Sequence, residues 1–174
     1  MKTLILIRHA KSSWDDSGAR DFDRSLNHRG RHDAPEMGRR LAARLKASGI
    51  GLDGFVCSPA CRAVQTAELL IEALSFPLTS VEWRRELYLA SPRIMLEVIQ
   101  AMPDETATVA LLAHNPGITE LAEILTGETF GNVPTCGVIT LALPVEHWGE
   151  VPGVSAELID FDYPRRLSGS NGQE

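Results

Sequence analysis

The chain contains few cysteines, no excess of positive charge and no long apolar run. Its three cysteines lack CxxC spacing, so the pattern indicates neither a disulfide framework nor a zinc site of four thiolates. The 17 Lys and Arg residues are outnumbered by 23 Asp and Glu residues, and the formal net charge of -6 argues against a nucleic-acid binder. No stretch reaches the roughly 18 apolar residues of a membrane span, and no secretory signal pattern is present. We therefore expect a cytoplasmic protein.

What the chain does contain is an alternation of short β-rich runs with longer helical ones. Its 174 residues, 44% of them hydrophobic, suffice for one core. The expected strands are 3–7, 54–57, 106–113, 138–143 and 155–160, and the expected helices are 27–47, 59–74, 92–101 and 116–125. This alternation predicts an α/β fold. We expect a single domain over 1–163 and a polar, flexible tail over 164–174.

Two of the expected helices have a start signal in the sequence. Ser58 precedes Pro59, and Asn115 precedes Pro116, so each pair places a capping side chain before a proline at the first helical position. A helix that starts at Pro59 has Arg62 in its first turn, where free N–H groups and the helix dipole favour an anion. Because a cation is mildly disfavoured there, Arg62 indicates a bound anion such as phosphate rather than an ordinary surface charge.

Two apolar strands end in a histidine. The first strand ends at Arg8-His9 and a later one at His114. A single histidine of this kind is more often structural. However, the carboxyl ends of parallel strands meet at the edge of the sheet where α/β enzymes place their chemistry. Two histidines and two arginines, counting Arg62, therefore predict a site for a doubly negative group.

The polar segment 10–26 is long for a connection in a compact domain, and we interpret it as a wall of this site. Lys11 and Ser12 could add donors to the pocket, although solvation explains Lys11 equally well. Trp14 could fold over the site or simply anchor the segment.

Other charged residues have ordinary explanations. The loop carboxylates could bind a cation, but hydration or pairing with Arg20 and Arg24 is the favoured interpretation. They are Asp15, Asp16, Asp21 and Asp23. The arginines Arg39, Arg40 and Arg44 alternate with apolar residues, which is typical of a solvated helix face.

Three motifs together resemble the histidine phosphatase superfamily, the phosphoglycerate-mutase-like group. They are Arg8-His9, Ser58-Pro59-x-x-Arg62-x-x-Gln65-Thr66 and His114-Asn115-Pro116, and they span most of the chain. Three further features are most similar to the SixA-type phosphohistidine phosphatases: the short length, the run Asp23-Arg24-Ser25-Leu26-Asn27-x-Arg29-Gly30, and the absence of a long insertion between Arg62 and His114. The resemblance implies a three-layer α/β/α sandwich with a mostly parallel central sheet.

The resemblance also implies roles for the four residues. His9 is expected to be the nucleophile and to form a phosphohistidine intermediate, while Arg8, Arg62 and His114 hold the phosphoryl oxygens. The chemistry agrees, because a neutral imidazole can attack phosphorus and fixed cations stabilise the charge on its oxygens. No metal or other cofactor is expected. The chain departs from the family pattern at Ala10, where glycine is common.

The leaving group decides between substrate classes. Relatives that act on phosphate monoesters protonate the leaving group with a carboxylate, and Glu86, in the run Trp83-Arg84-Arg85-Glu86-Leu87, lies at the corresponding place. Phosphohistidine leaves as imidazole and depends less on an acid. We expect a protein phosphohistidine phosphatase, with a small-molecule phosphomonoesterase or a non-catalytic phosphoryl-binding module as alternatives. The expected partner is a phosphorylated protein or a small phosphoester, not nucleic acid or membrane. The oligomeric state is left open.

Overall fold

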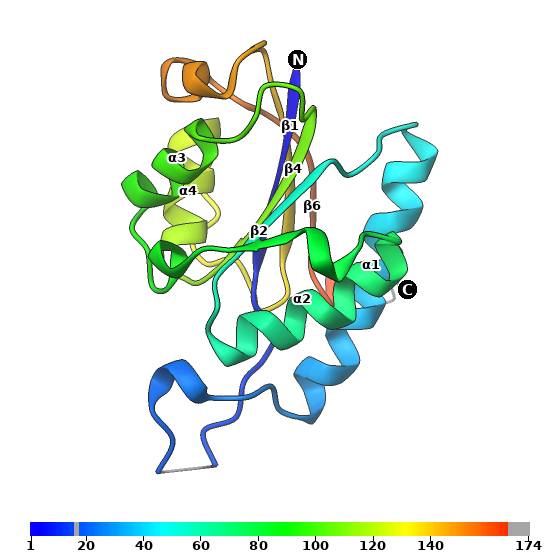
Figure 1. Cartoon of the computed structure of the whole chain (residues 1–174), viewed down its shortest axis with the longest axis vertical. Helices are drawn as coiled ribbons and strands as arrows, with labels where there is room; N and C mark the ends of the chain where they lie inside the picture. The colour runs from blue at the N-terminus through cyan, green and yellow to red at the C-terminus, as the bar shows by residue number, and fades with distance from the viewer. Residues whose placement is uncertain (16–17, 167–174) are drawn as a thin grey trace, which may run out of the picture.

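The computed structural model describes residues 1–15 and 18–166, so most of the expected tail lies outside the described residues. Those residues form a six-stranded sheet in the order β3-β2-β4-β1-β5-β6, and Figure 1 shows this sheet nearly edge-on. The strands are β1 (Lys2–Arg8), β2 (Gly54–Cys57), β3 (Val81–Trp83), β4 (Thr108–Ala113), β5 (Val138–Leu143) and β6 (Glu157–Asp162). The pairs β1–β4, β2–β4 and β2–β3 are parallel, whereas β5 is antiparallel to both β1 and β6. The sheet is thus mostly parallel, as expected.

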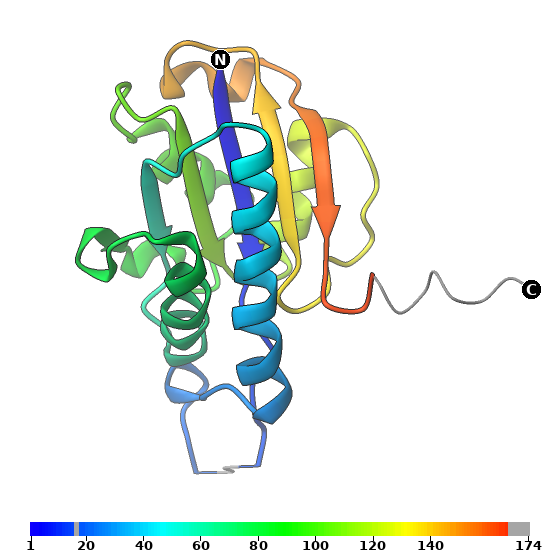
Figure 2. The ribbon, with the colours of Figure 1, turned by 90° about the vertical axis from the view of Figure 1, so that its right-hand side faces the viewer.

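Helices cover both faces of this sheet. They are α1 (His28–Ala47), α2 (Cys61–Leu74), α3 (Pro92–Gln100) and α4 (Gly117–Thr126). α1 and α2 lie on one face and α3 and α4 on the other (Figures 1 and 2). Along β1, Leu4 and Leu6 pack into the core beneath α3 and α4, while Ile5 and Ile7 pack beneath α1 and α2. A strand buried on both faces needs this continuous apolar run, and the three-layer prediction is confirmed.

The predicted start of the second helix is wrong by two residues. α2 begins at Cys61 after Ala60, and no side chain caps it. The hydroxyl of Ser58 instead lies 2.7 Å from Nε2 of His114, a residue far away in the sequence. The same hydroxyl accepts a hydrogen bond from the N–H of Ala60 at 3.3 Å, and Ala60 has an extended backbone (φ -60°, ψ 140°), so the helix begins only after it. Arg62 nevertheless remains in the first turn.

The predicted start of the last helix also shifts. α4 begins at Gly117, with Pro116 as its N-cap residue and no side-chain cap. Asn115 still serves this end of the helix, because its Oδ1 accepts hydrogen bonds from the backbone N–H (3.3 Å) and the hydroxyl (3.0 Å) of Thr119. The strand expected at 155–160 lies two residues later, as β6.

The segment between β1 and α1 forms a loop closed at its base, at the carboxyl end of β1. An antiparallel bridge joins Ser12 to Leu26, and the N–H of Ser13 donates to the carbonyl of Ser25 at 2.9 Å. Gly30, in the first turn of α1, packs against the loop so closely that a Cβ there would lie 2.2 Å from the carbonyl oxygen of Lys11. The base of the loop is therefore fixed to α1.

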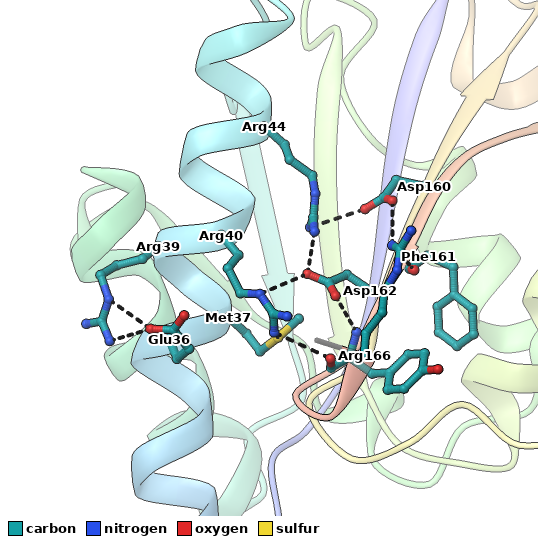
Figure 3. Close-up of polar contacts among 10 residues, drawn as sticks. Glu36, Met37, Arg39, Arg40, Arg44, Asp160, Phe161, Asp162 and Arg166 are labelled. Atoms are coloured by element: carbon teal, nitrogen blue, oxygen red, sulfur yellow. Dashed lines mark hydrogen bonds and ion pairs between the residues drawn. The ribbon is translucent and has the colours of Figure 1, made fainter. Parts of the chain in front are cut away.

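A cluster of ion pairs joins α1 to β6 (Figure 3). The side chain of Asp162 is fully buried (0% exposed), and its Oδ2 lies 2.5 Å from Arg44 Nη2 and 3.4 Å from Arg40 Nε. Arg44 also pairs with Asp160 at 3.1 Å. The expectation of a solvated face is therefore wrong for Arg40, whose side chain is 12% exposed, and holds for Arg39, at 63%. A buried carboxylate needs such partners, because an unpaired charge is costly to bury.

No helix within residues 1–15 and 18–166 combines the length and the apolar character needed to cross a membrane.

Candidate active site

A pocket at the carboxyl ends of β1, β2 and β4 brings the four predicted site residues together. Its lining consists of Arg8, His9, Lys11, Ser12, Trp14, Asp21, Arg24, Arg62, Leu89, His114, Asn115 and Thr135. The parallel register explains the meeting of the histidines: Arg8 lies opposite Ala113, and the N–H of His9 donates to the carbonyl of Ala113 at 3.1 Å. The ring centroids of His9 and His114 are 5.1 Å apart.

The ring of His9 is oriented by the backbone of the next residue, Ala10. Nδ1 lies 2.7 Å from the carbonyl oxygen of Ala10, and since a carbonyl only accepts, the neutral ring must carry its proton on Nδ1. Nε2 then keeps its lone pair and accepts a hydrogen bond from Nε of Arg62 at 3.3 Å. Nε2 is therefore the atom of this ring that can attack a phosphorus atom beside a guanidinium group.

Both pocket histidines are neutral at physiological pH. Burial is the largest cause that lowers the pKa of His9 to about 3; the hydrogen bond to Ala10 opposes it, and the charges of Arg62 and Arg8 add to it. Burial, followed by the repulsion that a protonated His9 would add and by the charge of Arg62, lowers the pKa of His114 to about 3. The lone pair of the His9 ring is thus available without loss of a proton.

We expect the imidazole NMR signals of His9 and His114 to stay unchanged between about pH 5 and pH 8, the range in which an unperturbed histidine changes charge. His147 is an internal reference, because its hydrogen bond to Asp104 raises its pKa above the ordinary value. A titration midpoint of His9 near the ordinary histidine pKa of 6.5 would contradict the neutral pocket. Below about pH 6.5 these two histidines bind protons in the unfolded chain but not in the folded protein. The free energy of unfolding should therefore also fall on acidification.

Two buried polar atoms of the pocket have no hydrogen-bond partner among the described residues. They are Nε of Arg8 and Nδ1 of His114. The rest of each side chain is held in place, by a 2.7 Å hydrogen bond from Arg8 Nη1 to the carbonyl of Val133 and by the contact of His114 with Ser58. Such orphan atoms are rare in proteins and often mark a functional site. They support an anion-binding role for both side chains.

Sequence reasoning missed Arg24 as a pocket residue. Its side chain is 9% exposed, Nη1 donates to the hydroxyl of Ser12 at 2.6 Å, and the guanidinium carbon lies 3.7 Å from the ring centroid of Trp14. Ser12 is thus a buried acceptor for Arg24, and Trp14 folds over this arginine at the edge of the pocket. Lys11 also lines the pocket. The run Asp23-Arg24-Ser25 contains this arginine, but the expected role of Arg24 was an ion pair with a loop carboxylate.

Asp21 is a further pocket residue. The expected pairing of loop carboxylates is confirmed for Asp21 with Arg24 (3.0 Å) and for Asp23 with Arg20 (2.8 Å), whereas Asp16 lies outside the described residues. Asp21 also pairs with Arg62 at 3.1 Å and accepts a hydrogen bond from the hydroxyl of Tyr88 at 2.6 Å.

These partners keep the carboxyl group of Asp21 ionised. Burial raises its pKa, but the hydrogen bonds from Tyr88 and Arg24 and the charge of Arg62 lower it to about 2. A carboxyl group with that pKa has no proton to donate near neutral pH.

Glu86 lies outside the pocket. It stands in the short 3-10 helix η3 (Arg85–Leu87), where Leu87 is fully buried and Glu86 is exposed. Its carboxylate lies 3.7 Å from Nη1 of Arg84 and lines a separate depression on the surface. Tyr88 reaches the site instead, with its ring 5.6 Å from that of His114. The structure therefore does not bring Glu86 into the pocket with the other four predicted site residues.

Known proteins are similar to this chain in sequence and in fold. A family model described as histidine phosphatase superfamily (branch 1) matches residues 4–133, a stretch that includes all four predicted site residues. The chain belongs to the histidine phosphatase superfamily. An uncharacterized protein of Mycobacterium tuberculosis is 32% identical over 169 residues, which cover 91% of this chain and 100% of the relative.

Solved structures indicate which branch of the superfamily the chain resembles. A candidate phosphohistidine phosphatase SixA from Agrobacterium tumefaciens is 30% identical, with a TM-score of 0.76 over 94% of this chain and 99% of the other. Its counterpart from Nakamurella multipartitia is 25% identical, with a TM-score of 0.77 over 94% and 96% of the two chains. The SixA-type branch predicted from the motifs is confirmed.

Proposed function

We propose that this protein is a phosphatase that hydrolyses phosphohistidine on other proteins through a covalent intermediate on His9. One observation carries the choice of substrate class. Among the described residues, the single carboxylate that lines the pocket is Asp21, and it is ionised because its pKa is about 2. The pocket therefore has the cations that a phosphoryl group needs but no carboxylic acid to protonate an alkoxide.

The reaction then proceeds in two steps. Nε2 of His9 forms a bond to phosphorus while the bond from phosphorus to the substrate nitrogen breaks, and that nitrogen keeps the electron pair. Because the substrate ring carries a proton on its other nitrogen, it leaves as neutral imidazole without help from an acid. Water then hydrolyses the phosphoryl group from His9 and releases inorganic phosphate.

The surrounding groups stabilise the charge of the phosphoryl oxygens during transfer. Arg62 is placed for this role, because its Nε lies 3.3 Å from the attacking nitrogen of His9. Arg8 and His114 line the same pocket and supply further donors. Positioning and fixed positive charge account for most of the catalysis of phosphoryl transfer, so the pocket needs few further groups.

The substrate class is tested by the kcat/KM of the full chain on three substrates: a protein phosphorylated on histidine, a phosphoserine peptide and a sugar phosphate. We expect phosphohistidine to exceed the two esters by about 10²-fold or more, since a general acid that esters need contributes about 10²–10⁴-fold. The Glu86→Gln variant should have the same three values as the wild type. Equal rates on esters and phosphohistidine, or a selective loss of ester hydrolysis in Glu86→Gln, would contradict the proposal and favour a phosphomonoesterase.

A further inference from the structure

Two large apolar side chains stand exposed at the mouth of the pocket. Trp14 is 72% exposed and Leu89 is 56% exposed, and both line the cavity that contains His9. They come from separate segments, the loop after β1 and the turn before α3, which lie near the same end of the sheet (Figure 1). Exposed apolar residues are ordinary when scattered singly, but a pair at the rim of a binding pocket indicates a contact surface.

Leu89 is held in this position by a strained backbone. Its φ of 49° lies in the left-handed region, which is unfavourable for leucine. The residues on either side are fixed: Tyr88 donates to Asp21, and the carbonyl of Ala90 lies so close to Gly117 that a Cβ there would be 2.2 Å away. The chain thus maintains an unfavourable conformation that directs an apolar side chain into solvent. Strain of this kind clusters at functional sites.

The charges below the rim indicate what the surface contacts. Arg8, Arg24, Arg62 and Lys11 outnumber the single carboxylate of Asp21 among the described lining residues, so the floor of the pocket suits a phosphoryl group. The cavity of about 250 Å³ is smaller than the roughly 300–1,000 Å³ typical of small-molecule sites. A phosphorylated side chain fits that volume, and the polypeptide that carries it must then cross the rim.

From these observations we infer that Trp14 and Leu89 bind apolar residues that flank the phosphohistidine in a protein substrate. The inference rests on the proposed function and adds where the polypeptide docks. It also explains why Trp14 is stacked on Arg24, 3.7 Å from the ring centroid, because the stack holds an exposed ring in one position. Free phosphohistidine has the same leaving group but no flanking residues, so it should not use the rim.

The test compares kcat/KM for a histidine-phosphorylated protein with that for free phosphohistidine. We expect the Leu89→Asn and Trp14→Ala variants each to lower the ratio of the two values by about tenfold, the scale of a contact residue truncated in an interface, mainly through KM for the protein. Asparagine tolerates the left-handed region, so Leu89→Asn should fold. Ile124→Asn is the matched control, since Ile124 is 62% exposed, does not line the pocket and should leave the ratio unchanged.

Leu89→Gly separates docking from general damage. Glycine relieves the left-handed strain, so this variant should unfold at the same temperature as the wild type or higher, yet show the same tenfold fall in the ratio. If the wild type hydrolyses both phosphohistidine substrates but the ratio is unchanged in both Leu89 variants, the rim inference is wrong and the proposed function stands. If the wild type hydrolyses neither, the proposed function fails and the rim inference fails with it.

Discussion

The His9→Ala variant is expected to hydrolyse an aryl phosphate about 10⁴-fold more slowly than the wild type, or worse, because it lacks the nitrogen that would bond to phosphorus. An aryl phosphate suits this measurement, since its leaving group needs little help from an acid. The fold should survive, because the side chain of His9 contacts the backbone of its neighbour Ala10 and the guanidinium of Arg62 but completes no part of the core. Circular dichroism checks that the variant is folded.

The covalent step has its own measurement. Rapid quenching of the wild type with a radiolabelled substrate should trap an acid-labile label on the protein, and His9→Ala should trap none. His32→Ala is the control, because the side chain of His32 is 77% exposed and does not line the pocket. Full activity in His9→Ala would place the chemistry elsewhere, and a label that persists in that variant would point to a different nucleophile.

The Asp162→Ala variant is expected to lower the free energy of unfolding by about 3–5 kcal/mol, the usual loss when one partner of a buried ion pair is removed. Arg40 would lose its paired carboxylate while its side chain stays 12% exposed, and Arg44 would keep only Asp160. Urea unfolding at neutral pH measures this change.

The control for Asp162 is an exposed ion pair on α1, the helix that also carries Arg40 and Arg44. Glu36 and Arg39 are 2.8 Å apart with side chains 44% and 63% exposed, and both appear in Figure 3. Removing that pair with Glu36→Ala should cost less than about 1 kcal/mol, as for most surface pairs. If the two variants lose equal stability, burial of Asp162 does not have the energetic role assigned to it.

The central sheet and the four pocket residues could be predicted because local signals specify them. A run of apolar residues that stops at Arg8-His9, and another that stops at His114, place those side chains at strand ends whatever the rest of the chain does. Arg62 follows from the same kind of signal, a helix start after a buried strand, and it kept its place in the first turn although the helix begins two residues late.

The remainder of the site depends on contacts that no local pattern reveals. Ser58 contacts His114, and Arg24 joins the pocket through Ser12 and Trp14. Glu86 was assigned by its resemblance to relatives that act on phosphate monoesters, but a short 3-10 helix buries Leu87 and leaves Glu86 outside the pocket. The left-handed backbone of Leu89 was unexpected for the same reason, because leucine carries no propensity for it.

The bridge between Ser12 and Leu26 divides the loop after β1 into an anchored base and an outer part that contains Asp21 and Arg24. The base carries Lys11 and Ser12 and is locked to α1 through Gly30, so it cannot change length without disturbing the reacting groups. The outer part returns to the site, because the backbone carbonyl and the carboxylate of Asp21 both accept hydrogen bonds from the guanidinium of Arg62. A change of length on either side of the bridge would therefore move a group that touches the cation beside His9. Divergence of substrate range in this loop is then expected through replacement of exposed side chains such as Trp14, not through insertions or deletions.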